Sequence, residues 1–199
     1  MKNTFLLLVL LTSFCAASQE KEKPIYLSKD QSLGLINAIN MQVVNTTTDQ
    51  CLTNIERVKQ ELRLKLEQSD VKVYDEPLGG NASAVDLVIS ANGWKPNNYG
   101  CVGNFSLNVY YFGYHAFNES FIRKQTTLLL KSSLATSSTD LNAMFSDFAI
   151  ENIAKLSADI ISARRDTDVV KFFEGNPQLK EVRTVKEIQV LVETLLKEF

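Results

Sequence analysis

Alternating apolar and polar residues form the strongest pattern in the chain, on both sides of Asn118-Glu119-Ser120. A side-chain period of two is typical of a β-strand. In the first run the two sets are Phe105, Leu107, Val109 and Tyr111 on one side, and Ser106, Asn108, Tyr110, Phe112 and Tyr114 on the other. We therefore predict a β-hairpin from Asn104 to Ala135 and expect the rest of the chain to pack around it.

Three further strands are predicted ahead of this hairpin. A strand-like pattern occupies Asn40 to Asn45, and a short strand runs from Val71 to Asp75. Alternation from Val85 to Ala91 indicates a longer one. The stretch from Asn92 to Gly100 is predicted to be a loop, and it carries the only tryptophan, Trp94.

Apolar residues at intervals of three to four predict helices elsewhere. The first helix has N-cap candidates at Thr46 to Asp49 and an inward stripe of Cys51, Ile55, Val58, Leu62 and Leu66. A long helix has cap candidates at Ser137 to Thr139 and a stripe of Leu141, Phe145, Phe148, Ile153, Leu156 and Ile160. A short helix from Asp166 to Phe173 is stopped by Gly175-Asn176-Pro177.

A terminal helix completes the chain. Thr184 and Glu187 have the spacing of a capping box. The apolar stripe of this helix comprises Val185, Ile188, Val192, Leu195 and Phe199. Each large apolar side chain contributes roughly 1.5 to 3 kcal/mol when buried, so we expect the helix to pack on the domain.

The predicted order is strand, helix, strand, strand, strand, strand, helix, helix, which defines an α+β two-layer sandwich. We expect a mainly antiparallel sheet with helices on one face and an additional C-terminal helix. The predicted divisions are a signal peptide over 1–18, a flexible segment over 19–32, the α+β domain over 33–165 and a helical extension over 166–199. The order of elements from Leu33 to Arg164 looks like that of several small bacterial envelope domains, including auxiliary proteins of transport and outer-membrane assembly systems. The resemblance is one of order and rests on no diagnostic motif.

The first 18 residues have the organisation of a secretory signal peptide. Lys2 precedes an unbroken apolar run from Phe5 to Leu11, and small residues follow at Ala16 to Ser18. A membrane anchor would need roughly 20 apolar residues, so this run is too short, and no later segment is longer. Lipid attachment at Cys15 is an alternative, although the preceding residues lack the Leu of a bacterial lipobox. We expect cleavage after residue 17 or 18 and a secreted or periplasmic protein.

Cleavage at this point leaves two cysteines, Cys51 and Cys101, in an oxidising compartment. Two cysteines have one intramolecular pairing, and we predict that it forms. Closing a loop of about 50 residues stabilises a fold by roughly 4 kcal/mol on the chain-entropy argument. A free catalytic thiol is the alternative, but it would leave the other cysteine unexplained and has no suitable histidine near it in sequence.

Charge and motif content argue against several function classes. The net charge is −2 and the charges are interspersed, which does not favour nucleic-acid binding. His115 is the only histidine, so a catalytic triad or zinc site would lack a second imidazole. Asp75 and Glu76 are neighbours whose side chains point to opposite faces of a strand. Gly79-Gly80 lacks the spacing and the Lys of a phosphate-binding loop, and we predict no metal and no cofactor.

Four N-glycosylation sequons begin at Asn45, Asn81, Asn104 and Asn118. Asparagine favours loops in any case, so their positions carry little information. They are modification sites only if the source is eukaryotic.

Tyr110, Phe112 and Tyr114 are predicted to face away from the helices. Exposed aromatic stripes often mark a surface for a partner or ligand. Trp94 and Tyr99 in the neighbouring loop extend this candidate binding surface. The alternative is that the terminal helix folds across the stripe and buries it.

Two functions compete at this point. The first is an exported, non-enzymatic binding or envelope-assembly accessory protein, whose partner is another exported or envelope protein and which acts through the aromatic face and loop. The second is a secreted hydrolase of unfamiliar type, using Asp or Glu groups that only the fold brings together. The lack of a catalytic motif favours the first. A cleft with two acidic groups of perturbed pKa would favour the second.

Overall fold

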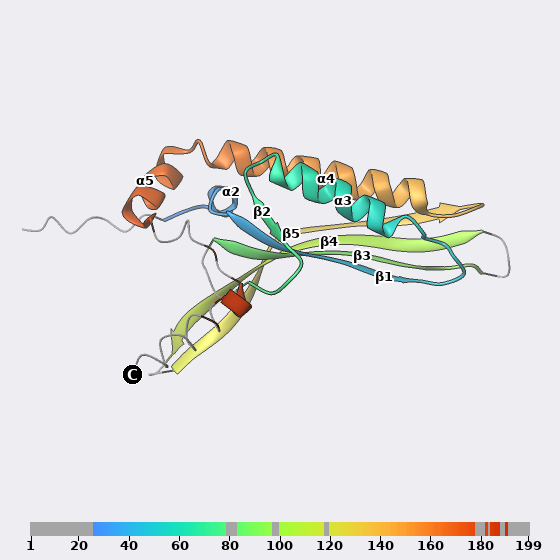
Figure 1. The fold of residues 1–199 in the computed structure, drawn as a ribbon, viewed down its shortest axis with the longest axis horizontal. Helices are drawn as coiled ribbons and strands as arrows, with labels where there is room; N and C mark the ends of the chain where they lie inside the picture. Colours follow the sequence, from blue (N-terminus) through green and yellow to red (C-terminus); the bar gives the residue numbers. More distant parts are fainter. Residues whose placement is uncertain are drawn as a thin grey trace, which may run out of the picture.

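The computed structural model describes residues 26–78, 83–96, 100–117, 120–177, 182, 184–187 and 190, with residues 112–124 described at the level of the backbone. In chain order the elements are α2 (Lys29–Leu33), β1 (Ala38–Thr47), α3 (Ile55–Glu67), β2 (Lys72–Tyr74), β3 (Ala84–Trp94), β4 (Cys101–Phe117), β5 (Ser120–Ser137), α4 (Asn142–Ala163) and α5 (Thr167–Gly175). Figure 1 shows α3 and α4 side by side on one face of the sheet. The fold is α+β in two layers.

The sheet is mixed, which corrects the prediction of a mainly antiparallel meander. Its strands follow the order β2-β1-β3-β4-β5. β1 is parallel to both β2 and β3, whereas β4 is antiparallel to β3 and β5. The crossover through α3 returns the chain to the end where β1 began, so β2 runs parallel to β1. β2 is short, and the chain then enters β3 from the same end on the other side of β1.

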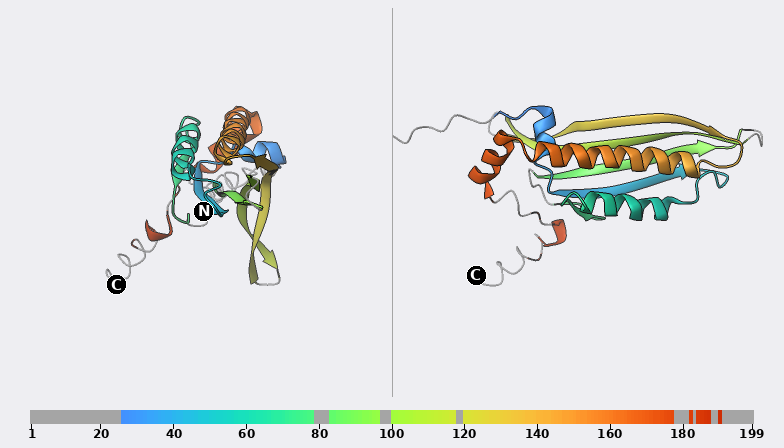
Figure 2. Two further views of the ribbon diagram at one scale, coloured as in Figure 1. Left: turned by 90° about the vertical axis from the view of Figure 1, so that its right-hand side faces the viewer. Right: turned by 90° about the horizontal axis from the view of Figure 1, so that it is seen from above.

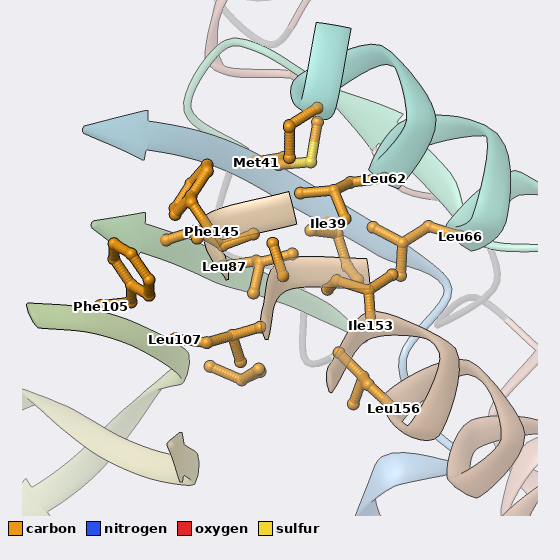
Figure 3. Close-up of a cluster of buried hydrophobic side chains, with 14 of the residues drawn as sticks. Ile39, Met41, Leu62, Leu66, Leu87, Phe105, Leu107, Phe145, Ile153 and Leu156 are labelled. Carbon is orange, nitrogen blue, oxygen red and sulfur yellow. The ribbon is translucent and has the colours of Figure 1, made fainter. Parts of the chain in front are cut away.

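The helix-facing side of the sheet forms one apolar core with α3 and α4. Figure 3 shows its central members, which are Ile39, Met41, Leu87, Phe105 and Leu107 from the sheet and Leu62, Leu66, Phe145, Ile153 and Leu156 from the helices. The ring centroids of Phe105 and Phe145 lie 5.3 Å apart in an edge-to-face arrangement. Both predicted helix stripes are buried, with Ile55 and Phe148 partly so.

Both long helices begin later than predicted. α3 begins at Ile55, well after the expected caps at Thr46–Asp49, and α4 begins at Asn142, after the expected caps at Ser137–Thr139. Strands β1 and β5 extend further than their sequence pattern indicates, because cross-strand pairing holds those polar residues in the sheet. Neither helix has a side-chain hydrogen bond at its N-cap.

The predicted disulfide between Cys51 and Cys101 is confirmed, with Cα atoms 5.6 Å apart. Cys51 lies in the connection ahead of α3 and not on the helix, which corrects the prediction. Its backbone carbonyl accepts a hydrogen bond from the Leu141 N–H at 2.7 Å. The Oδ1 atom of Asn142, the first residue of α4, accepts one from the Thr53 N–H at 2.8 Å. The disulfide and the start of α4 therefore form one corner.

Two glycines make room for this corner. Gly93 and Gly103 lie opposite each other in β3 and β4, on the helix-facing side. A Cβ at Gly103 would lie 2.8 Å from Cδ1 of Leu141, a side chain that is fully buried. Only glycine at this position leaves the space that Leu141 fills.

Arg164 fixes the other end of α4. Its Nη1 donates to the Ser69 carbonyl at 2.7 Å, and its Nη2 donates to the carbonyls of Ile36 at 2.6 Å and Asp70 at 3.3 Å. Burial lowers the pKa of Arg164, and the charge of Asp70 offsets part of this effect. One guanidinium thus joins the end of α4 to the end of α3 and to the approach to β1.

The predicted hairpin is confirmed and extends slightly beyond both predicted ends. The pairing of β3 with β4 reaches Val85, opposite Tyr111, whereas β4 continues to Phe117. A register shift between β4 and β5 occurs at Val109/Tyr110, where such irregularities bend strands. Figures 1 and 2 show that the two-stranded end of the hairpin leads away from the helix layer.

The terminal segments are described in part. α5 matches the predicted short helix, whereas the pattern did not predict α2, which begins with a capping box between Ser28 and Gln31. The predicted signal peptide and residues 19–25 of the predicted flexible segment lie outside the described residues. Among the helices of the described chain, none is long and apolar enough to cross a membrane.

The capping box between Thr184 and Glu187 is confirmed. The Thr184 N–H donates to the Glu187 carboxylate at 2.7 Å, and the Glu187 N–H donates to Thr184 Oγ1 at 3.1 Å. Thr184 forms a β-bridge with Leu78. Figure 1 shows the short helical segment 185–187 on the side of the sheet away from α3 and α4. Ile188, Val192, Leu195 and Phe199 lie outside the described residues, so the docking of the terminal helix stays a prediction.

The double replacement Cys51→Ala and Cys101→Ala should reduce the free energy of unfolding by as much as about 4 kcal/mol, because it releases a loop closed over 50 residues. Urea denaturation of the variant beside the parent chain measures the loss. Reduction of the parent with dithiothreitol serves as the control and should produce a similar loss. An unchanged unfolding midpoint in both experiments would contradict the assigned role of the bond.

The substitution Arg164→Met should reduce the free energy of unfolding by about 3 kcal/mol, because it leaves buried carbonyls without a donor. Arg165→Met is the matched control. It removes an exposed charge at the next position and should cost less than about 0.5 kcal/mol. Denaturant melts of both variants test the assignment, and equal losses would refute it.

Candidate binding surface on the open face of the sheet

The side of β1, β3, β4 and β5 that points away from α3 and α4 is called the open face below. Directly paired residues share a face, so the strand register defines its rows. Three successive rows are Gln42, Val88, Asn108 and Leu130; then Val44, Ser90, Ser106 and Ser132; then Thr46, Asn92, Asn104 and Leu134. Apart from Val88, the central strands β3 and β4 therefore present polar side chains in these rows, whereas β5 presents Leu130 and Leu134.

Exposed apolar side chains lie at two borders of the open face. Trp94, at the end of β3, is 55% exposed. Leu130 and Leu134 on β5 are 64% and 85% exposed. These three differ from the helix-facing residues of the same strands, such as Ile89 and Leu107, which are fully buried. Large apolar groups left in water on an otherwise ordered sheet are typical of a contact surface.

The centre of the open face carries hydroxyl and amide groups. The hydroxyls of Ser90 and Ser106 are hydrogen-bonded at 2.7 Å, and Asn108 Nδ2 donates to Ser106 Oγ at 3.4 Å. The Thr46 hydroxyl contacts the Asn92 side chain. These groups are half-buried or exposed and hold each other in fixed positions, so they can offer a partner hydrogen bonds at low entropic cost.

A buried amide lies near the opposite end of the open face. Asn40 is 2% exposed, and its Nδ2 donates to Asp86 Oδ1 at 2.8 Å. Its carbonyl oxygen has no hydrogen-bond partner in the structure. Tyr74 and Tyr110 are the register neighbours on either side of this pair. The row of Tyr74, Asn40, Asp86 and Tyr110 therefore forms a polar and aromatic end of the open face.

The predicted aromatic site residues do not form one cluster. Trp94 lies in β3 and not in a loop, which corrects the prediction. Tyr110 lies opposite Asp86 and is half-buried on the open face, as predicted. Trp94 and Asp86 are eight residues apart on β3, so Trp94 and Tyr110 are roughly 26 Å apart. Phe112 and Tyr114 lie on β4 beyond the described side chains, and Tyr99 lies outside the described residues.

The exposed leucines of β5 were not among the predicted site residues. Leu128, Leu129 and Leu130 are consecutive, and this run hides the alternation of the strand. At the register shift opposite Val109/Tyr110, β5 has one more residue than β4. The alternation of faces is interrupted there, so three consecutive residues of β5 can be apolar. Leu130 and Leu134 are separated by an even number of positions and therefore lie on the same face of the strand. This spacing is the feature of the sequence that could have identified them.

The acidic groups among the described residues give no evidence of a catalytic pair. The described residues contain no cluster of three or more His, Cys, Asp or Glu side chains that could hold a metal. The carboxyl groups with a shifted pKa are Asp75 and Asp166, and both are lowered, whereas a general acid needs a raised pKa. The hydrogen bond from the backbone N–H of Asp168 is the main cause of the lowered pKa of Asp166. Glu76 is exposed, and the side chain of His115 is outside the described part of the structure.

A pocket of about 470 Å³ lies where α5 approaches the start of β2. Asp70, Lys72, Arg164 and Glu174 contribute the charged part of its lining. The Arg164 guanidinium is already bonded to backbone carbonyls, as described above. The Arg164 guanidinium is therefore not available to a ligand in this pocket.

The described sequon residues are exposed. Asn45 lies on β1, where its Oδ1 accepts a hydrogen bond from the Thr47 N–H at 2.9 Å. Asn104 lies on the open face opposite Leu134. Asn81 and Asn118 lie outside the described residues.

No family model matches the chain, and no curated protein matches it. Among solved structures, one similar chain is described as "Crystal structure of uncharacterized protein". The two sequences are 10% identical, and the similarity covers 70% of this chain and 95% of that one with a TM-score of 0.29. This similarity carries no functional argument.

The substitution Asp75→Asn should lower stability near neutral pH and have no effect in strong acid. The hydrogen bond from Lys59 lowers the pKa of Asp75, and the charge of Arg63 adds to this effect. A carboxylate with a lowered pKa contributes stability above its unfolded value of about 3.9 and loses it as pH falls through the folded pKa. Because the side chain is 54% exposed, screening limits the effect to less than about 1 kcal/mol.

Urea melts of the Asp75→Asn variant at about pH 7 and about pH 2 test this linkage. Glu76→Gln, at the next position, is the matched control and should leave the unfolding midpoint unchanged. A difference from the parent chain that persists undiminished in acid would contradict the role of the carboxylate charge.

Proposed function

We propose that this chain is an exported, non-enzymatic binding or assembly accessory protein that contacts another exported or envelope protein through the open face. The observation that carries the proposal is the contrast between the two faces of one sheet. Helix-facing apolar residues of the central strands, such as Ile89 and Leu107, are buried, whereas Trp94, Leu130 and Leu134 on the open face are more than half exposed. The disulfide supports an oxidising compartment such as the periplasm or the extracellular space.

The shape and composition of the open face favour a protein as the partner. Small molecules bind in concave, mostly apolar pockets, whereas the open face is one side of an extended sheet. Protein interfaces combine apolar anchors with a polar surround that forms hydrogen bonds. Trp94 is the best anchor on this surface, because tryptophan is enriched among residues that dominate binding energy. The Ser90, Ser106 and Asn108 groups supply the hydrogen bonds.

Site-specific photocrosslinking in the exporting cell tests the proposal. A benzoylphenylalanine at Asn104, on the open face, should give one discrete protein adduct. The same residue at Glu56, which is exposed on α3, should give none. The crosslinked protein is then identified by mass spectrometry and purified.

Calorimetry with the purified partner completes this test. Trp94→Ala should weaken binding at least about tenfold, which is the typical loss at an interface anchor. Leu64→Ala is the matched control, because Leu64 is 60% exposed on α3. Equal effects of the two substitutions, or equal adducts from both crosslinker positions, would overturn the proposal.

A further inference from the structure

β5 is the edge of the sheet and one of its two longest strands. Its residues Ser120–Ser137 pair with β4 on one side, and no described strand pairs with the other side. The opposite edge differs, because β2 is three residues long and is followed by the bridge between Leu78 and Thr184. A long edge with unpaired N–H and C=O groups is a template for pairing with another strand.

Few of the usual protective features guard this edge. Proteins block edge pairing with proline, with charged side chains, with bulges or with very short strands. From Gln125 to Ser137 the strand has no proline and one charged residue, Lys131. The register shift at Val109/Tyr110 lies midway along β5 and leaves Leu129 to Ser137 in regular pairing with β4. Ser133 faces the helix side and is exposed, so the helix layer does not cover the outer edge there.

We propose that two copies of this chain associate through β5, paired antiparallel about a two-fold axis at Ser132. A two-fold axis perpendicular to the sheet keeps both helix layers on one side and both open faces on the other. Open-face residues then pair only with open-face residues of the second copy. This condition leaves a small number of registers to compare.

The register centred on Ser132 is self-complementary. It places Leu130 of each copy directly opposite Leu134 of the other, and Lys131 opposite Ser133. Leucine side chains that lie directly opposite each other on neighbouring strands stabilise the strand pair. In this register the Lys131 side chains of the two copies do not lie opposite each other. A register centred on Lys131 would instead place the two lysines opposite each other and Leu130 opposite Ser132. The register centred on Ser132 therefore fits the sequence of β5 better than the register centred on Lys131.

Two-fold pairing is the arrangement expected of a homodimer, because the same patch serves both copies. Pairing of one strand from each copy makes a small interface, whereas stable interfaces bury at least about 1,200 Å². The dimer should therefore dissociate on dilution. The two sheets would become one sheet of ten strands with a continuous open face, so the inference is independent of the identity of any other partner.

Analytical ultracentrifugation of the full chain over a range of concentrations tests the association. The parent chain should show a concentration-dependent monomer-dimer equilibrium. The double variant Leu130→Lys and Leu134→Lys places like charges opposite each other and should raise the dissociation constant at least about tenfold. The double variant Leu130→Glu and Leu134→Lys places opposite charges in register and should retain the dimer.

Val44→Lys is the matched control, because Val44 is 40% exposed on the open face of β1, away from the edge. It should leave the equilibrium unchanged. A parent chain that stays monomeric at all concentrations would overturn the proposal and leave β5 as an edge for a different partner. A dimer that both double variants preserve, or that Val44→Lys abolishes, would also overturn it.

Cysteine crosslinking tests the register directly in a chain whose Cys15 is replaced by serine. Ser132→Cys places two thiols opposite each other across the axis, within reach of a disulfide, and should give a covalent dimer on mild oxidation. In this register Thr136 lies opposite Leu128 of the second copy, so Thr136→Cys should give no covalent dimer. Equal crosslinking at both positions would refute the register.

Discussion

The packing of α4 along the sheet is the interaction on which the rest of the structure depends. The helix is fixed at both ends by contacts that do not resemble each other. At its start, Leu141 fills the space above Gly93 and Gly103, next to the disulfide. At its end, the Arg164 guanidinium binds backbone carbonyls from two other segments. A helix that is fixed at both ends in this way holds α3 in a defined position on the sheet.

One helix layer covers one face of a sheet, and this limit explains the composition of the strands. The helix-facing positions of β3 and β4 are apolar, whereas their open-face positions include Ser90, Ser106 and Asn108. Such polar groups form hydrogen bonds with each other and with water, so this face of the sheet does not need an apolar layer over it. Trp94, Leu130 and Leu134 break that rule, because water does not satisfy a large apolar group. The departures from the expected pattern are therefore the residues that point to a contact.

The sequence predicts local structure where a period is unbroken and fails where pairing over a distance decides. The helix stripe from Leu141 to Ile160 and the hairpin followed directly from alternation and spacing. The direction of β2 and β3 did not, because the crossover through α3 is a property of the topology. The pattern of polar residues suggested caps at Thr46 to Asp49, but pairing with β3 kept part of that segment in β1. Trp94 lies in β3 and not in the predicted loop for the same reason.

The two edges of the sheet differ in a way that bears on function. β2 is too short to pair extensively, and the segment after it is bonded to the chain near Thr184. β5 is six times as long, and its outer side faces no described strand. A protein that avoided aggregation by protecting both edges would place charge or proline along β5. Leu130 and Leu134 lie at equal distances from Ser132, and pairing of two copies through this part of β5 would join their open faces into one continuous surface.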